Sequence, residues 1–544
     1  MRKILIVLIS TLALSSLSAP VFAQTKIKMT VGDRIKYIDA DENYQKEYWD
    51  AAYGLYKELH SKYPTDSKIS YKAGKVCLIL KKYDEALTFL TTSAENKPKG
   101  VKDLELWLGQ AQHKEGLLDQ ALVNYEAYRK TLKGKRQTTD IVNDYIHQVS
   151  LAKKYMAVPV NVVIKNMGET INSEYIESNP SVTADGKVLI FSTCRPENTG
   201  GLKDPTFGIY YQDIWMSERD SVTGEWQDAE IIRGALNSKD HDASPSISAD
   251  GNVIFIYKSV NGGDLYYSKK RRNGEWREPE PIKGKVNTTY FESSGCITAD
   301  KKSIFFVSER PGKGLGNADV WMAKKSGSYE YEEPVNLGPI INSIDDEVSV
   351  FVHPDGKTIF FASNGKNSIG GYDIFKSELK DGKWTTPINL GYPINTLGDE
   401  KQFSLTADGK KAYITSHRDD TKGEFDIYEI DMSNYTLPDP EGINQGSNTI
   451  TSGSISIFKG KVLDGKEGTP VEATVKITDD KGHVVDELET SESGDFLIVL
   501  EGDVTYTVSV NVSGFAPYED KVLIPKTPGK TETIVKAIFL EDAQ

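Results

Sequence analysis

The sequence predicts a multidomain protein with an α-helical repeat region, then a five-bladed β-propeller, then a small β-sandwich. Three observations support this order. Apolar residues in the first third of the chain repeat every 34 or 35 residues. An Asp-Gly or Asp-Lys turn then recurs at intervals near fifty residues, and residues 455–544 alternate short strands with tight turns. A chain of 544 residues is too long for one hydrophobic core, so several domains are expected.

Residues 1–23 have the three parts of a secretory signal. Arg2 and Lys3 precede the apolar run 4–14, and Val21-Phe22-Ala23 forms the cleavage end. We therefore expect an exported protein that is periplasmic and associated with the outer membrane. No Cys follows the predicted cleavage point, so a lipid anchor is not indicated. No later apolar run approaches the roughly 20 residues that a membrane span needs.

Residues 24–157 are predicted to be helical. Ala52, Ala86 and Ala121 mark equivalent positions in successive units, at steps of 34 and 35 residues. This pattern resembles the tetratricopeptide repeat, with a partial first copy, two clear copies over 40–132 and a capping helix at 139–156. The resemblance implies a concave face that takes peptides or partner helices. The alternative is a rigid arm that binds nothing.

Residues 158–435 are predicted to form the propeller. The turn aspartates follow one another at intervals of 65, 50, 55 and 53 residues, and four short strands fit each unit. The last unit stops after its third strand near Asp431, and we expect the segment 159–164 to complete it by strand donation. A sixth, degenerate blade is the alternative. The phrases at 213–215, 248–251 and 354–357 resemble TolB-type, WD-like repeats. The turn aspartates are Asp185, Asp250, Asp300, Asp355 and Asp408.

Residues 436–454 are Pro-, Gly- and Ser-rich and are predicted to be a linker. The strands and turns of 455–544 resemble the carboxypeptidase regulatory-like β-sandwich, a small domain without catalytic activity. Gly460, Gly494, Phe496 and Tyr506 lie in the phrases that carry this resemblance.

An acidic residue lies eight positions before each turn aspartate. Five carboxylates at equivalent places would form a ring near the mouth of the central channel, and oxygen ligands of this kind suit Ca²⁺. The alternative is that each acid accepts backbone hydrogen bonds at the start of its strand. No other cofactor is expected. The candidate ring consists of Glu177, Asp242, Glu292, Glu347 and Glu400.

Several other recurring residues are interpreted as structural. The turn aspartates suit hairpin geometry. Trp226, Trp276 and Trp384 recur at one place in the blade, which favours packing between blades over sugar stacking. The odd cysteine count, without metal spacing, indicates buried apolar residues. The longest insertion, 196–211, mixes polar turns with aromatic residues, a composition found in functional loops and in neutral ones alike. The aspartates that open the third strands are Asp213, Asp264, Asp319, Asp373 and Asp426, and the cysteines are Cys77, Cys194 and Cys296.

Charge and motif content limit the function. The formal net charge is −14, and −16 without Arg2 and Lys3, which disfavours binding to nucleic acid. The seven His show no metal-binding spacing, and neither a Gly-x-Ser-x-Gly elbow nor a P-loop occurs. We expect no enzymatic activity, although acids from different blades could in principle act together.

Taken together, the predicted domains resemble envelope proteins of Bacteroidota, and in particular the PorE-like accessory proteins of the type IX secretion system. That family continues into an OmpA-like peptidoglycan-binding domain, whereas this chain ends at Gln544 with the sandwich. The resemblance implies a scaffold or adaptor that contacts envelope proteins through the helical arm and a propeller face. The alternatives are a glycan- or peptidoglycan-binding module and a propeller enzyme.

Overall fold

The computed structural model describes residues 28–96, 100–204, 208–312, 314–365, 367–439, 450, 455–527 and 530–543. The predicted signal and most of the predicted linker lie outside these ranges. The chain divides into two compact units, Met1–Ala111 and Gln112–Gln544, and each is considered by itself. No helix in the described residues is both long and apolar enough to cross a membrane.

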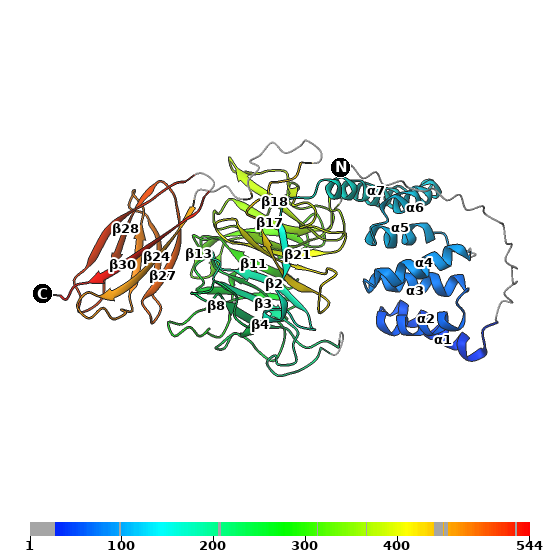
Figure 1. Cartoon of the computed structure of the whole chain (residues 1–544), viewed down its shortest axis with the longest axis horizontal. Coiled ribbons are helices and arrows are strands. Elements are labelled where there is room, and N and C mark those ends of the chain that lie inside the picture. The colour runs from blue at the N-terminus through cyan, green and yellow to red at the C-terminus, as the bar shows by residue number, and fades with distance from the viewer. Residues whose placement is uncertain are drawn as a thin grey trace, which may run out of the picture. The chain divides into compact units, whose positions relative to one another are not determined.

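The first unit is a stack of antiparallel helix pairs (Figure 1). Small residues let the pairs approach closely: a Cβ atom built on Gly74 would lie 2.5 Å from the Leu90 side chain. Thr30 caps the first helix by accepting a hydrogen bond from the Asp33 N–H at 3.1 Å. The described residues of the whole chain contain seven α-helices: α1 (Val31–Gln45), α2 (Trp49–Lys62), α3 (Ser67–Ile79), α4 (Tyr83–Glu95), α5 (Leu104–Lys114), α6 (Leu118–Thr131) and α7 (Arg136–Ala157).

The helical prediction needs one correction. The first repeat, predicted to be partial, is a complete pair, because α1 and α2 pack together around Ala40, Ala52 and Tyr56. The predicted capping helix exists as α7 and begins three residues earlier than expected.

The propeller consists of five sheets within the described part of 163–431, and their strands are antiparallel except for one short parallel pair in blade 3. Blade 1 contains β2 (Glu177–Val182), β3 (Val188–Thr193), β4 (Asp213–Glu218) and β5 (Glu230–Ile231). Blade 2 contains β6 (Asp242–Ile247), β7 (Val253–Lys258), β8 (Asp264–Lys269) and β9 (Glu280–Pro281). Blade 3 contains β11 (Glu292–Ile297), β12 (Ser303–Ser308), β13 (Asp319–Gly327) and β15 (Val335–Asn336), with β10 (Lys283–Gly284) and β14 (Glu330–Tyr331) at the end of β13.

Blades 4 and 5 complete the ring. Blade 4 contains β16 (Glu347–Val352), β17 (Thr358–Ser363), β18 (Asp373–Lys380), β19 (Lys383–Trp384) and β20 (Ile388–Asn389). Blade 5 contains β21 (Glu400–Leu405), β22 (Lys411–Ser416), β23 (Asp426–Asp431) and the N-terminal strand β1 (Val163–Asn166). β1 pairs antiparallel with β23, so Ile164 lies opposite Ile430. Five blades and closure by strand donation are confirmed, although the donated strand begins at Val163 rather than residue 159.

The innermost strands are irregular next to the channel. In all five, the register with the second strand shifts just after the first residue or two. Asn179, Ser244 and Ser294 occupy the same place in blades 1 to 3 and have φ values of 56°, 47° and 50°, which non-glycine residues seldom adopt. All five innermost strands line a narrow space of about 30 Å³ that is rich in serine.

Aromatic packing between blades is confirmed. Trp276 is 2% exposed within a cluster built from blades 1 and 2. The rings of Trp226 and Tyr413 lie 5.9 Å apart across the seam between blades 1 and 5. The ring centroids of Trp384 and of Phe305 in blade 3 lie 6.1 Å apart. All three cysteines are buried and free.

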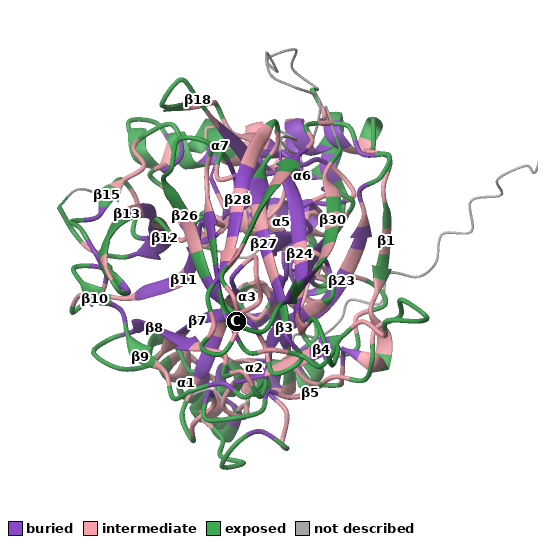
Figure 2. Ribbon diagram, turned by 90° about the vertical axis from the view of Figure 1, so that its left-hand side faces the viewer, coloured by how far each residue is buried: buried purple, intermediate pink, exposed green. Residues whose placement is uncertain are grey.

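The C-terminal domain is a sandwich of two sheets, with buried segments along β24 and β28 and a largely exposed β26 (Figure 2). Phe458, Val475, Val508 and Ile538 lie in its core. One sheet has the order β27 (Asp495–Glu501), β24 (Ile455–Asp464), β30 (Glu532–Leu540), and the other β26 (Val484–Glu489), β25 (Thr474–Thr478), β28 (Val504–Val510), β29 (Tyr518–Ile524).

Candidate functional site

Each of the five predicted ring acids is the first residue of an innermost strand and is completely buried. Each accepts hydrogen bonds from the backbone N–H and the hydroxyl group of a Ser or Thr four residues earlier. For Glu177, these bonds from Ser173 measure 2.8 and 2.6 Å. The same pairs recur as Ser238–Asp242, Thr288–Glu292, Ser343–Glu347 and Thr396–Glu400.

Four of these acids also have a cationic partner. In blades 1, 3 and 5 the partner is an arginine eighteen residues after the acid. The distances are 3.0 Å from Arg195 Nε to Glu177 Oε1, 3.4 Å from Arg310 Nη2 to Glu292 Oε1 and 3.7 Å from Arg418 Nη2 to Glu400 Oε1. In blade 2, Lys258 Nζ lies 2.5 Å from Asp242 Oδ1.

Blade 4 is the exception. The position eighteen residues after Glu347 is Gly365. The carboxylate is held by Ser343 and by the hydroxyl of Ser363 at 2.9 Å, and no cation contacts it within the described residues. Burial without a counter-ion raises the pKa of Glu347 to about 7.

This geometry matches the hydrogen-bonding alternative, because every acid is bonded at the start of its own strand. In the part of the chain that the structure describes, no three His, Cys, Asp or Glu side chains are placed to hold a metal ion. A shared Ca²⁺ site therefore stays a prediction without support from this arrangement.

The aspartates at the start of the third strands act similarly. Asp213 accepts the Thr199 N–H at 2.6 Å, and Asp373 accepts the Ile369 N–H at 2.7 Å. Each lies near the ring acid of the following blade. Burial raises the pKa of Asp213 to about 6, with a further contribution from Asp242. The pKa of Asp373 is also raised by burial and then by Glu400. The sequence showed both sets of acids but not their proximity.

Two of the turn aspartates have a further role that the sequence did not reveal. Lys459 Nζ of the sandwich lies 2.5 Å from Asp185. Lys301 Nζ of blade 3 lies 2.9 Å from both Asp250 and Asp486, the latter on the sandwich. Ile455 and Ile457 of β24 also pack against Ala184 and Ala407, which precede turn aspartates. The sandwich therefore docks on the propeller face that carries these turns.

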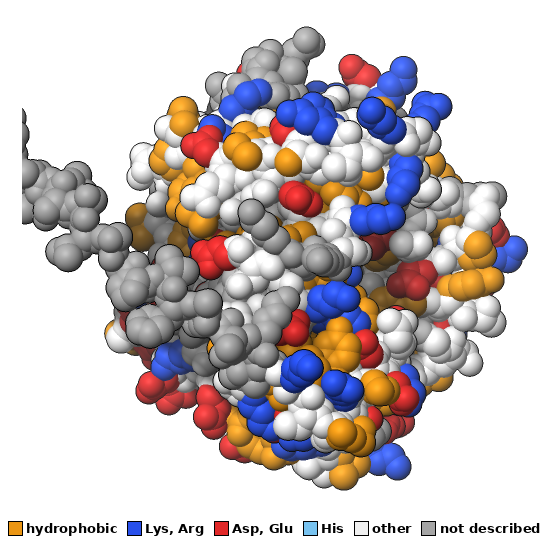
Figure 3. Space-filling model, turned by 90° about the vertical axis from the view of Figure 1, so that its right-hand side faces the viewer, with side chains coloured by type: hydrophobic (Ala, Val, Ile, Leu, Met, Phe, Trp, Pro, Cys, Tyr) orange, Lys and Arg blue, Asp and Glu red, His pale blue; other side chains and the backbone are white. Residues whose placement is uncertain are grey.

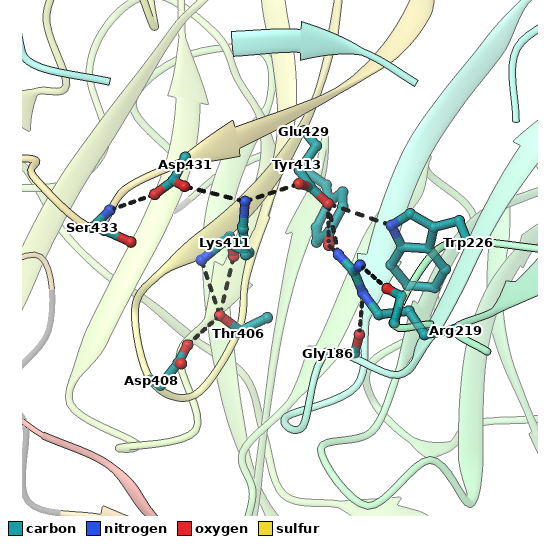
Figure 4. Close-up of polar contacts among 11 residues, drawn as sticks. Gly186, Arg219, Trp226, Thr406, Asp408, Lys411, Tyr413, Glu429, Asp431 and Ser433 are labelled. Atoms are coloured by element: carbon teal, nitrogen blue, oxygen red, sulfur yellow. Dashed lines mark hydrogen bonds and ion pairs between the residues drawn. The ribbon is translucent and has the colours of Figure 1, made fainter. Parts of the chain in front are cut away.

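A cleft of about 570 Å³ lies between the sandwich and blades 1 and 5. Its propeller wall is built around Arg219 (Figure 4). The Arg219 guanidinium donates to Glu429 at 2.7 Å, to the Tyr413 hydroxyl at 3.0 Å and to the Gly186 carbonyl at 3.1 Å, and lies over the Trp226 ring. These contacts bind blade 1 to blade 5. The remaining polar lining combines charged side chains with hydroxyl groups. The charged residues are Asp185, Lys187, Asp220, Asp408, Lys411 and Lys459, and the hydroxyl groups come from Ser221, Thr406, Thr531 and Thr533.

The helical unit carries a row of aromatic and lysine side chains on α1, α3 and α5. Lys75 Nζ lies 5.8, 5.3 and 4.4 Å from the ring centroids of Tyr44, Tyr71 and Trp107. Asp103 fixes two of these rings by accepting from the Tyr71 hydroxyl at 2.6 Å and the Trp107 indole N–H at 2.9 Å. No acidic side chain among the described residues pairs with Lys75.

The insertion 196–211 is partly described, since residues 205–207 lie outside the described ranges. Asn198 donates to the carbonyls of Thr193 at 2.6 Å and Tyr211 at 2.8 Å, and its side-chain oxygen accepts from Trp215 Nε1. The described ends of this loop are therefore tied to the blade.

On the face in Figure 3, basic, acidic and apolar side chains are mixed, without a field of one sign.

No protein-family model matches the chain, and no curated protein matches it. Among solved structures, the type III secretion translocator chaperone SycD of Yersinia enterocolitica is 16% identical, with 23% of this chain and 90% of that chain covered and a TM-score of 0.21. TolB from Acinetobacter baumannii is 16% identical over 56% and 71% of the two chains, with a TM-score of 0.30. Hydrazine synthase of Kuenenia stuttgartiensis is 10% identical over 68% and 63%, with a TM-score of 0.31. These TM-scores are all below 0.5, so the fold assignment rests on the helices and sheets of this chain itself.

Proposed function

We propose that this protein is a non-enzymatic scaffold of the bacterial envelope. In this proposal the α1, α3 and α5 face of the helical unit binds an extended segment of a partner protein. The supporting observation is Lys75, whose ammonium group lies among three aromatic rings and has no acidic partner in the described part of the chain. Such a face offers apolar area together with an ionic contact for an acidic side chain.

The propeller and sandwich form the structural body of this scaffold. Lys301 and Lys459 join the two domains through buried or half-buried ion pairs, and β1 closes the ring. We propose export to the periplasm, association with the outer membrane, and service as an accessory of a secretion assembly of the type IX kind, on the strength of the predicted signal and the PorE-like order of domains.

Cross-linking with mass spectrometry in the native host tests the scaffold proposal. The wild-type chain should cross-link to specific envelope proteins, and Trp107→Ala and Lys75→Glu should abolish these cross-links. Lys130→Glu, an equal charge change at an exposed position of α6, should retain them. Recovery of the wild-type protein alone, or equal cross-linking by all variants, would contradict the proposal.

A second candidate function is glycan or peptidoglycan binding, favoured by the cleft of about 570 Å³, whose lining combines charged and hydroxyl groups. Small-molecule sites are commonly clefts of this size and occur preferentially at domain interfaces. The protein should then pellet with purified sacculi, and Thr533→Val with Thr531→Val should reduce the pelleted fraction. Absence of the wild-type protein from the pellet counts against this function and leaves the scaffold proposal standing.

A further inference from the structure

The arginines of blades 1, 3 and 5 occupy equivalent positions in their blades. Besides the ring acid, each donates to a carbonyl of the segment that enters the blade: Arg195 to Ile171, Arg310 to Val286 and Arg418 to Ile394. Each guanidinium also lies over an aromatic ring in the third strand of its own blade. These rings are Trp215 at 4.5 Å, Trp321 at 5.1 Å and Tyr428 at 5.3 Å.

Blade 4 keeps every part of this position except the arginine. Glu347 retains its two hydroxyl partners, and Phe375 takes the place of the aromatic ring. The equivalent carbonyl belongs to Ile341 and accepts no hydrogen bond from the described residues. The side chain itself is missing because the position is Gly365. A guanidinium binding frame is therefore present without a guanidinium of the same blade.

The surroundings of this frame favour a cationic group with apolar neighbours. Burial and then neighbouring carboxylates raise the pKa of Asp345, and the same causes raise the pKa of Glu309. Ile344 and Ile340 are 84% and 49% exposed on the loop that enters the blade. Toward α7, the frame is bordered by Gln148, which donates to the Gly365 carbonyl at 3.2 Å.

We propose that blade 4 binds the guanidinium group of an arginine from a partner protein, at the position that Arg195, Arg310 and Arg418 fill in their own blades. The partner segment carries this arginine next to apolar residues that cover Ile340 and Ile344. The proposal concerns the propeller and does not depend on the helical face discussed above.

Two matched substitutions test the frame. Gly365→Arg supplies the guanidinium from the chain itself. The three atoms nearest to its Cβ atom would be side-chain oxygens of Ser363, Asp345 and Ser343, at 3.3 to 3.4 Å, so these side chains must shift by a few tenths of an ångström. We expect the melting temperature to rise by about 2–4 °C. Arg310→Gly makes blade 3 resemble blade 4 and should lower the melting temperature by more than that.

Methylguanidinium is the probe for binding. At millimolar concentration it should raise the melting temperature of the wild type, raise that of Arg310→Gly further, and leave Gly365→Arg and Glu347→Gln with less than half of the wild-type shift. Methylammonium at equal ionic strength is the control and should give less than half of the effect. An equal response of wild type and Gly365→Arg would overturn the proposal.

Lys366 lies outside the described residues, so its variant belongs in the same series. If Lys366→Ala lowers the melting temperature as far as Arg310→Gly does, and methylguanidinium stabilises only that variant, a lysine of the chain itself serves blade 4 and the proposal is wrong. If Lys366→Ala has the melting temperature of the wild type, and methylguanidinium raises both melting temperatures equally, the proposal stands. The capped amino acid N-acetyl-arginine amide should then compete with methylguanidinium for the site, whereas N-acetyl-lysine amide should not.

Discussion

Blades 3 and 4 are neighbours with the same hydrogen-bonding frame around a buried glutamate, yet among the described residues only Glu292 of blade 3 has a counter-ion. Glu292 is held by Thr288, Ser308 and Arg310, whereas Glu347 is held by Ser343 and Ser363. Both acids are fully buried. The difference shows that the hydroxyl and backbone donors are enough to position the carboxylate. The arginine has the separate task of neutralising it.

The largest expected effect separates these two tasks. Glu292→Ala leaves Arg310 buried without its carboxylate and should reduce the free energy of unfolding by about 3–5 kcal/mol. Glu347→Ala removes only neutral hydrogen bonds and should cost about 1–3 kcal/mol. Urea unfolding followed by tryptophan fluorescence measures both. Equal losses would show that Arg310 contributes nothing to blade 3.

A pH titration sharpens the comparison. The pKa of Glu347 is raised to about 7 in the folded protein from an ordinary value of 4.5. The stability that its neutral form contributes is therefore complete below about pH 4.5 and is lost as the pH rises through about 7. Glu347→Gln cannot ionise, so it should exceed the wild type by on the order of 1–3 kcal/mol at about pH 8 and match it at about pH 4. A constant difference between the two proteins across this range would contradict the expected pKa.

A similar contrast exists on the face that the sandwich covers. Lys301 bridges Asp250 and Asp486 and its side chain is 19% exposed, so Lys301→Ala should cost about 1–3 kcal/mol and speed proteolysis within the predicted linker 436–454. The rate of linker cleavage by a nonspecific protease measures this docking. An unchanged rate would indicate that the other contacts, which include Lys459–Asp185 and the packing of Ile455 and Ile457, hold the sandwich without Lys301.

The smallest effect is expected at the rim of the same interface. Lys357 lies 3.8 Å from Glu501, and both side chains are more than half exposed. Such a pair is screened by water and salt, so Lys357→Ala should change stability by less than about 0.5 kcal/mol. It is the control for Lys301→Ala in the proteolysis assay. A loss as large as that of Lys301→Ala would mean that the contact is better ordered than its exposure implies.

The blade count was predictable because the Asp turns are local features and recur in every blade. Closure was predictable from the similarity of 159–164 to a fourth strand, although the exact strand was not. Helix α1 was underestimated because its repeat has Asp39-Ala40 where the other two have Ala73-Gly74 and Leu108-Gly109. The docking of the sandwich could not be predicted from the sequence, because Lys301 and Asp486 are 185 residues apart.

The contrast between blades is visible in the sequence. Aligning the units on the ring acids places Arg195, Arg310, Gly365 and Arg418 in one column. The signal was in the sequence, but its meaning needed the burial of the acids and the direction of the guanidinium groups. Motifs alone do not show which carboxylates are neutralised.

The closure of the ring has a mechanical consequence. The chain enters the propeller at β1 and leaves it at β23, and the pair Val163–Asp431 stands at both the entry and the exit. Tension applied between the two ends of the propeller would load this pair first and then Ile164–Ile430, one rung after another. Opposed strands pulled in this way separate rung by rung instead of sharing the load. We therefore expect single-molecule stretching to show an early event at low force, in which a four-residue ladder yields while the sheets of blades 1 to 4 stay intact.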